Sequence, residues 1–128
     1  MQLHSFKVRA IAFGVAGIAA VAAISAVLTL TSDRATVSAD EREGATVVTY
    51  KNSKFVPNTI TATAGEPLRI VVDNRDLIMH DIAVPTEGVK VNLGPNEEKV
   101  VTVTFDQPGE YAVICTLHAN MTGEIMVE

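Results

Sequence analysis

The sequence predicts an all-β fold, an antiparallel Greek-key β-sandwich, preceded by one N-terminal hydrophobic helix. Three observations lead to this prediction. Beyond residue 44, apolar and polar residues alternate with period two, and turns containing Pro or Gly interrupt the alternation about every ten positions. No stretch there keeps a helical repeat over about ten residues or more. Roughly seven or eight short strands of this kind are typical of a two-sheet sandwich.

The individual strands follow from the same alternation. In each expected strand every second residue is apolar and should face the core, whereas the residues between them, such as Arg69 and Asp73, should lie on the opposite face. A further strand is expected over 78–84, with His80 near its start. The expected core positions are Ile60 and Ala62; Leu68, Ile70 and Val72; Val101, Val103 and Phe105; Tyr111, Val113 and Cys115; and Ile125 and Val127.

The N-terminal region looks like a membrane segment rather than part of the domain. Residues 10–32 carry no charge, and Lys7 and Arg9 precede them. As a helix rising about 1.5 Å per residue, they would reach roughly 34 Å, enough to cross a hydrocarbon core of about 30 Å. The preceding positive charges favour a cytoplasmic N-terminus and an exported remainder. We therefore expect a signal anchor over 1–32, a polar linker over 33–44 and one globular domain over 45–128.

A cleaved secretory signal is the alternative for this region. Val37-Ser38-Ala39 has the small-x-small pattern of a cleavage site, so cleavage after Ala39 would release the domain. In both cases the domain would work on the exported side of the cytoplasmic membrane, in a periplasmic or extracellular position.

Charge and cysteine content exclude some classes. The chain has 10 Lys and Arg against 15 Asp and Glu, a net charge of −5. This balance argues against nucleic-acid binding, which needs clustered basic residues. The single cysteine, Cys115, excludes an internal disulfide and leaves a metal as a plausible stabiliser of a small domain.

Four residues form a candidate metal site. Cys115, His118 and Met121 are spaced three apart between two expected strands, and His80 lies near the start of another. A thiolate and a thioether are soft ligands that suit copper, and imidazole binds both copper oxidation states. Zinc is the nearest rival, but structural zinc sites favour several cysteines and rarely use Met.

Each residue alone could have an ordinary structural role: the Cys as a buried apolar group, the His as a hydrogen-bonded side chain, the Met as core filling. Their coincidence on one short loop favours a site for one copper ion cycling between Cu(I) and Cu(II).

These residues resemble the cupredoxins, the small blue-copper electron carriers. The similarity covers about 47–127 and rests on Phe55-x-Pro57, Gly65-Glu66-Pro67, the strand around His80, and the run from Pro108 to Gly123. The Cys-x2-His-x2-Met spacing is similar to that of amicyanins. The resemblance implies that His80, Cys115 and His118 are strong equatorial ligands and Met121 a long axial one. It also implies that the His118 edge carries electrons through an apolar patch.

The chain departs from the family pattern in two places. Leu117 and Ala119 flank His118 where amicyanin-type loops are rich in proline; they could form the patch, with Leu77, Met79 and Pro95 as weaker candidates. Asp81 follows the first ligand His where many family members have Asn. We expect Asp81 to accept a hydrogen bond from Thr116 and, when ionised, to favour Cu(II) and lower the reduction potential. A solvent-facing carboxylate is the alternative.

The expected function is that of a type 1 copper protein, which moves one electron between an unidentified redox protein donor and acceptor. We expect a monomer with no nucleic-acid partner, tethered to the membrane by its N-terminal helix if that helix is uncleaved. One alternative is a copper-binding protein for delivery or buffering, although the Met- and His-rich clusters typical of such proteins are absent. The second alternative is an enzyme. No third residue that would orient a Cys-His catalytic pair is apparent, so we expect no enzymatic activity.

Overall fold

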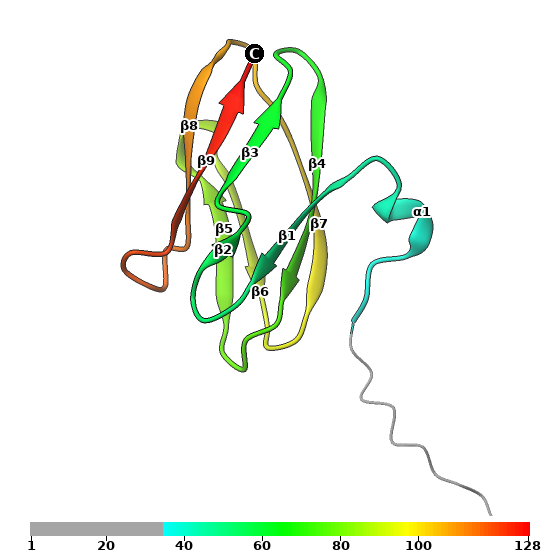
Figure 1. The fold of residues 1–128 in the computed structure, drawn as a ribbon, viewed down its shortest axis with the longest axis vertical. Coiled ribbons are helices and arrows are strands. Elements are labelled where there is room, and N and C mark those ends of the chain that lie inside the picture. Colours follow the sequence, from blue (N-terminus) through cyan, green and yellow to red (C-terminus); the bar gives the residue numbers. More distant parts are fainter. Residues whose placement is uncertain (1–34) are drawn as a thin grey trace, which may run out of the picture. The chain divides into compact units, whose positions relative to one another are not determined.

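The computed structural model describes residues 35–128 and places nine strands, one short α-helix and one 3-10 turn within them (Figure 1). The elements in chain order are α1 (Ala39–Arg42), β1 (Thr46–Tyr50), β2 (Phe55–Val56), β3 (Thr59–Ala62), β4 (Pro67–Asn74), β5 (His80–Val84), η1 (Pro85–Glu87), β6 (Val89–Leu93), β7 (Glu98–Thr104), β8 (Gly109–Ile114) and β9 (Thr122–Val127).

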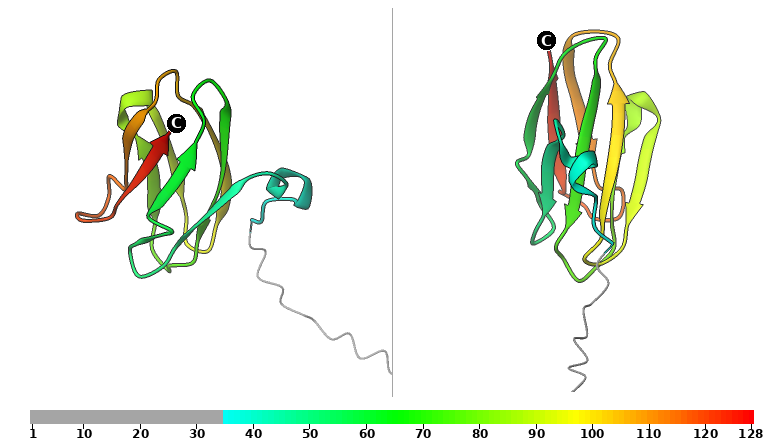
Figure 2. Two further views of the ribbon diagram at one scale, coloured as in Figure 1. Left: turned by 45° about the horizontal axis from the view of Figure 1, so that its top comes forward. Right: turned by 90° about the vertical axis from the view of Figure 1, so that its right-hand side faces the viewer.

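The strands form two sheets, which confirms the all-β sandwich. One sheet has the order β2-β1-β4-β7 and the other the order β3-β9-β8-β5-β6. Figure 2 shows the two layers after a quarter turn, with most strands running along the long direction of the sandwich. The space between the layers holds the core.

The expectation of purely antiparallel pairing is wrong at two places. β1 pairs with β4 in parallel, and β3 pairs with β9 in parallel. The reason lies in the crossing of the chain from one sheet to the other between β2 and β3. After that crossing, strands distant in sequence become neighbours. Alternation along a strand reports which face is buried but not the direction of the strand beside it.

The predicted core is largely confirmed. Among the positions expected to face inward, ten are buried: Ile60, Ile70, Val72, Val101, Val103, Phe105, Val113, Cys115, Ile125 and Val127. Ala62, Leu68 and Tyr111 are half-buried and pack against this cluster. The period-two pattern therefore identified the buried face of each of these strands.

Three local features differ from the expectations. Asp73 on β4 is buried rather than solvent-facing, and it forms an ion pair with Arg75 at 2.7 Å. The strand expected from residue 78 begins at His80, and Ile78 and Met79 are exposed. The stretch expected as a polar linker contains α1, which Ser38 caps through hydrogen bonds with Glu41.

The expected N-terminal hydrophobic helix, over 1–32, lies outside the described residues. From residue 35 to residue 128, no helix is long and apolar enough to cross a membrane.

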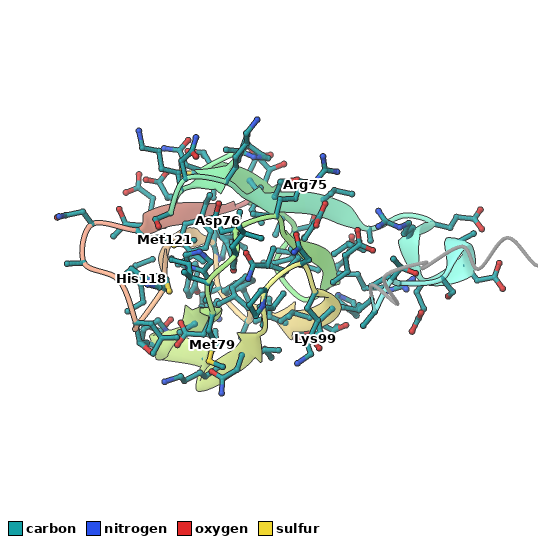
Figure 3. All side chains as sticks on the ribbon, turned by 90° about the horizontal axis from the view of Figure 1, so that it is seen from below. Arg75, Asp76, Met79, Lys99, His118 and Met121 are labelled. Atoms are coloured by element: carbon teal, nitrogen blue, oxygen red, sulfur yellow. The ribbon has the colours of Figure 1, made fainter. Side chains whose placement is uncertain are left out.

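One end of the sandwich gathers the segments that carry the predicted ligands. β4 ends and β5 begins at this end, and the β8–β9 loop, drawn in orange to red, lies in the half of the sandwich away from the C-terminus (Figure 1). Figure 3 views the molecule from this end, where the labelled side chains include Asp76, His118 and Met121. We call this the loop end of the domain.

Candidate metal centre

Three of the four predicted ligands converge on one point. The ligand atoms of His80, Cys115 and His118 all lie within 4.8 Å of one another. The Cys115 Sγ lies 3.8 Å from the His80 Nδ1 and 3.5 Å from the His118 Nδ1. His80 and Cys115 are buried, and His118 is half-buried. Two imidazole nitrogens thus face one sulfur, one from the start of β5 and the other from the β8–β9 loop.

Met121 closes the same loop. Its side chain is buried and belongs to the core cluster that contains Cys115. The Cys115 N–H donates to the Met121 carbonyl oxygen at 3.0 Å, and the Met121 N–H donates to the His118 carbonyl oxygen at 3.4 Å. Asn120, just before Met121, has a left-handed φ of 67°. These bonds make the loop tight, so that its three candidate ligands stay close together.

Asp76 determines which His80 nitrogen is free for a metal. Its Oδ2 lies 2.9 Å from the His80 Nε2. Burial tends to raise the pKa of Asp76, but backbone hydrogen bonds from Ser53 and Asn52, together with His80, outweigh it and hold the pKa below its usual value. An ionised carboxylate only accepts hydrogen bonds, so Nε2 carries the hydrogen and Nδ1 presents its lone pair toward Cys115.

Asp76 is in turn fixed by the turn between β1 and β2. The N–H groups of Asn52 and Ser53 donate to its two oxygens at 2.8 and 2.9 Å, and both residues have a φ of 54°. Successive N–H groups in such turns form a small anion-binding concavity. Asp76 was not among the residues predicted from the sequence, because a carboxylate four residues before His80 has no recognisable pattern when the intervening loop is irregular.

Asp81 makes the predicted contact with the residue after the cysteine. It is fully buried, and it accepts a hydrogen bond from the Thr116 N–H at 2.7 Å and another from the Thr116 hydroxyl. The Asp81 N–H also points at the Cys115 Sγ, at 3.4 Å. The expected hydrogen bond is therefore confirmed, and the solvent-facing alternative is wrong.

The environment keeps the Asp81 carboxyl ionised. Burial tends to raise its pKa, but the hydrogen bonds from Thr116 and the charge of Lys90, whose Nζ lies 3.5 Å from Oδ2, together lower it below the usual value. A negative charge is thus held in the protein interior beside the ligand strand.

Tyr50 supports His80 from within the core, a contact that no sequence pattern predicted. Its ring meets the His80 ring edge to face, with centroids 5.5 Å apart. Its hydroxyl donates to the Asp81 carbonyl oxygen at 3.4 Å. Burial above all, then the charges of Cys115 and Asp81, raise the pKa of Tyr50, so the phenol stays neutral.

Exposed apolar side chains flank His118 in the chain and also lie in the loops that follow β4 and β6. Leu117 is 49% exposed, and Ala119 on the other side of His118 is also exposed. Of the weaker candidates, Leu77 is 81% exposed and Met79 54% exposed, and Pro95 is exposed as well. The surface at the loop end is therefore rich in apolar groups.

The donor set fits copper. Two neutral imidazoles and one thiolate can surround a copper ion in the His2Cys arrangement of blue-copper sites, with a thioether as the weak fourth ligand. Met121 is buried on the same loop as two of these donors. A zinc site would be expected to use more thiolates and no thioether.

Comparison with known proteins agrees with this geometry. A family model described as a cupredoxin-like domain matches residues 19–127 of the chain. The chain is a member of the cupredoxin-like family. Among curated sequences, this cupredoxin is 29% identical to amicyanin from Paracoccus versutus over 105 residues, covering 79% of the chain and 78% of amicyanin.

One further relative and one solved structure extend the comparison. Cytochrome c oxidase subunit 2 from Thermus thermophilus is 33% identical over 79 residues, which are 58% of the cupredoxin and 58% of that subunit. The crystal structure of amicyanin from Paracoccus versutus superposes with a TM-score of 0.54 and 25% identity, covering 74% of the cupredoxin and 90% of amicyanin. His80, Cys115, His118 and Met121 are positioned as a copper site, and copper is the cofactor of this cupredoxin.

Proposed function

We propose that the chain is a type 1 (blue) copper electron-transfer protein that carries one electron at a time between redox proteins. The observation that supports this most strongly is the convergence of the His80 and His118 Nδ1 atoms on the buried Cys115 Sγ. The bound copper would supply a one-electron couple between Cu(II) and Cu(I). We assign the equatorial positions to these three residues and the axial position to Met121.

The residues around the site would hold the ligands still. Asp76 fixes His80, and Asp81 joins the strand of His80 to Thr116, next to Cys115. A loop held by several hydrogen bonds moves little when the charge of the site changes. Small movement favours fast electron exchange, because little energy is then needed to rearrange the ligands.

His118 is the proposed route for electrons to and from the surface. It is half-buried, whereas His80 is fully buried, so its outer edge is the part of the ligand set nearest a docking partner. The exposed Leu117 and Ala119 on either side of it would make apolar contact with that partner. We propose no catalytic role, since the four donors of the site leave no position for a substrate.

The membrane attachment, location and oligomeric state of the protein are also proposals. We infer that residues 1–32 anchor the protein, that 33–44 connect the anchor to the domain over 45–128, and that the domain lies on the exported side of the cytoplasmic membrane. The uncharged stretch 10–32 and the preceding Lys7 and Arg9 support this orientation. We infer that the protein works as a monomer with an unidentified donor and acceptor.

Repeated redox cycling tests the proposed function. The copper-loaded protein would be reduced and reoxidised many times with small-molecule reagents in the presence of a Cu(I) chelator. An electron carrier is expected to return to its oxidised spectrum in every cycle and to retain its copper. Progressive loss of copper to the chelator in the reduced state would instead favour a protein for copper delivery or buffering.

A further inference from the structure

A groove of about 430 Å³ opens on the surface beside the β8–β9 loop. This volume is typical of small-molecule sites, which measure about 300–1,000 Å³. The lining comes from β2 with the turns on either side of it, and from the β8–β9 loop with the first residue of β9. The lining residues are Lys54, Phe55, Val56, Asn58, Asn120 and Thr122. We call this feature the Lys54 groove.

Close backbone packing fixes the two segments that line the groove. The Glu124 N–H donates to the Asn58 carbonyl oxygen at 2.7 Å, and β3 begins its parallel pairing with β9 at the next residue (Figure 1). Gly123 packs against the same carbonyl: a Cβ there would lie 2.7 Å from the oxygen and 3.3 Å from the Phe55 ring. The two segments are therefore held together, and the groove is formed before any ligand enters it.

Four of the lining residues carry polar side chains. Lys54 supplies an ammonium group, Asn58 and Asn120 supply amides, and Thr122 supplies a hydroxyl. Within residues 35–128, none of these four side chains forms a hydrogen bond or an ion pair. The lining contains one cation and no carboxylate, although the chain as a whole has a net charge of −5. The groove therefore suits an anion with several oxygen acceptors.

The other two lining residues are apolar. Phe55 is buried, with its ring beside Gly123, and Val56 is 53% exposed. Ligand sites combine apolar surface with a small number of polar groups that fix the orientation of the ligand. Phe55 and Val56 would contact the carbon part of a ligand, which favours an organic anion over an inorganic one.

Both segments of the lining adjoin the candidate metal centre. Asn120 and Thr122 flank Met121, the proposed axial ligand. On the other side, the Phe55 ring meets the Tyr50 ring edge to face with centroids 4.9 Å apart, and Tyr50 in turn meets His80. A negative charge in the groove therefore lies near the copper ion and stabilises Cu(II) more than Cu(I).

We propose that the Lys54 groove binds a small organic anion with two carboxylates, or with a carboxylate and hydroxyl groups, and that this binding lowers the reduction potential of the copper centre. The binding site does not depend on the metal, whereas the effect on the potential rests on the proposed function. By thermodynamic linkage, the anion then binds the Cu(II) protein more tightly than the Cu(I) protein. For charges about 10 Å apart and partly screened by water, we expect a ratio of about two to five between the two affinities.

Titration of the copper-free protein with succinate tests the site itself. The full-length chain would be kept in a neutral detergent at constant ionic strength, and its backbone amides followed by nitrogen–proton NMR. We expect saturable shifts at Asn58, Asn120 and Thr122. Succinamide, which has the same shape and no charge, should bind at least about fivefold more weakly. Inorganic phosphate should also bind more weakly than succinate, because it has no carbon part to contact Phe55 and Val56.

Two variants locate the ligand within the groove. Lys54→Gln removes the lining cation and should weaken succinate binding by about two- to fivefold. Lys51→Gln is the matched control, since it removes the same charge from the same turn outside the lining, and it should weaken binding by less than about 1.5-fold. Asn120→Gly removes an amide and retains the left-handed φ of 67°, so it should weaken binding by about two- to tenfold without strain.

Several results would overturn the proposal. The absence of saturable shifts would remove the site, and equal binding of succinate and succinamide would remove its preference for anions. Phosphate binding as tight as succinate binding would exclude an organic ligand. Equal losses in Lys54→Gln and Lys51→Gln would indicate general charge attraction instead of a groove.

The effect on the copper centre needs a separate measurement. The reduction potential of the copper-loaded protein would be titrated at constant ionic strength with saturating succinate or succinamide. A potential that succinate does not lower would overturn the coupling. The NMR titration requires no copper, so a colourless protein that binds succinate would overturn the proposed function and leave the site intact. A blue protein without succinate binding would overturn the site alone.

Discussion

Asp81→Asn removes one negative charge beside the candidate metal centre while conserving shape. The Asn oxygen can still accept the Thr116 N–H, and its amide can donate to the Thr116 hydroxyl in place of the hydrogen bond that the carboxylate accepts. The Asp81 backbone N–H, which points at the Cys115 Sγ, is unchanged. The variant should therefore fold and bind copper, and the main effect should be electrostatic.

The magnitude follows from the position of the charge. Asp81 follows His80 in the chain and contacts Thr116, so its carboxylate lies roughly 5–10 Å from the expected position of the metal. At an effective dielectric constant of about 20, this carboxylate stabilises Cu(II) relative to Cu(I) by roughly 2–3 kcal/mol. For a one-electron couple this is roughly 90–130 mV, since about 59 mV corresponds to a tenfold change in equilibrium. The Lys90 ammonium, 3.5 Å from the carboxylate, offsets part of this. We expect the potential to rise by about 50–100 mV.

Redox titration of the copper-loaded variant against the wild type measures this shift. Lys90→Gln is the matched control, because it removes the opposite charge from the same pair and should lower the potential. That decrease should be the smaller effect, since the Lys90 side chain is 52% exposed and better screened by water. An unchanged or lower potential in Asp81→Asn would refute the reasoning.

Three further predictions concern packing, ligand orientation and the metal itself. Gly123→Ala should destabilise the domain by about 1–3 kcal/mol, because an added Cβ would lie 2.7 Å from the Asn58 carbonyl oxygen; an unchanged urea midpoint would contradict this close packing. Asp76→Leu removes the acceptor of the His80 Nε2 hydrogen, so nitrogen NMR of the copper-free protein should show mixed His80 tautomers, and copper affinity should fall about 10–100-fold. Asp76→Asn keeps an acceptor and should retain most of the affinity; an equal loss in both variants would contradict the orienting role. Copper at a thousandfold excess over its dissociation constant should stabilise the wild type by about 4 kcal/mol, and a Cys115→Ser variant much less; equal stabilisation of both in thermal unfolding would exclude Cys115 as a ligand.

The parts of the fold that could be predicted from the sequence are those that depend on local pattern. Burial of Val101, Val103 and Phe105 follows from alternation with threonine on a single strand. The proximity of Cys115 and His118 follows from their separation by two residues at the end of one strand. In both cases the residues concerned are close in sequence, so no knowledge of distant pairing is needed.

The features that could not be predicted depend on contacts between distant segments. Asp76, which follows β4, accepts hydrogen bonds from the Asn52–Ser53 turn, which follows the neighbouring strand β1. The parallel pairing of β1 with β4 results from the passage of the chain into the other sheet between these two strands. The stretch around Ser38 has the Ser-x-x-Glu pattern of a helix start as well as that of a cleavage site. The sequence did not predict α1 in the expected linker, because the contacts that hold this stretch are long-range: the Val37 N–H donates to the Glu98 carboxylate, and Arg69 donates to the Glu41 carbonyl oxygen.

Visible absorption of the full-length protein titrated with Cu(II) tests the central claim most directly. A thiolate and two imidazoles around one copper ion predict an intense blue charge-transfer band that saturates at one equivalent and disappears on reduction. Cys115→Ser should take away the band. A colourless wild-type protein with Cu(II) bound would contradict the assignment of His80, Cys115, His118 and Met121 as a type 1 copper centre.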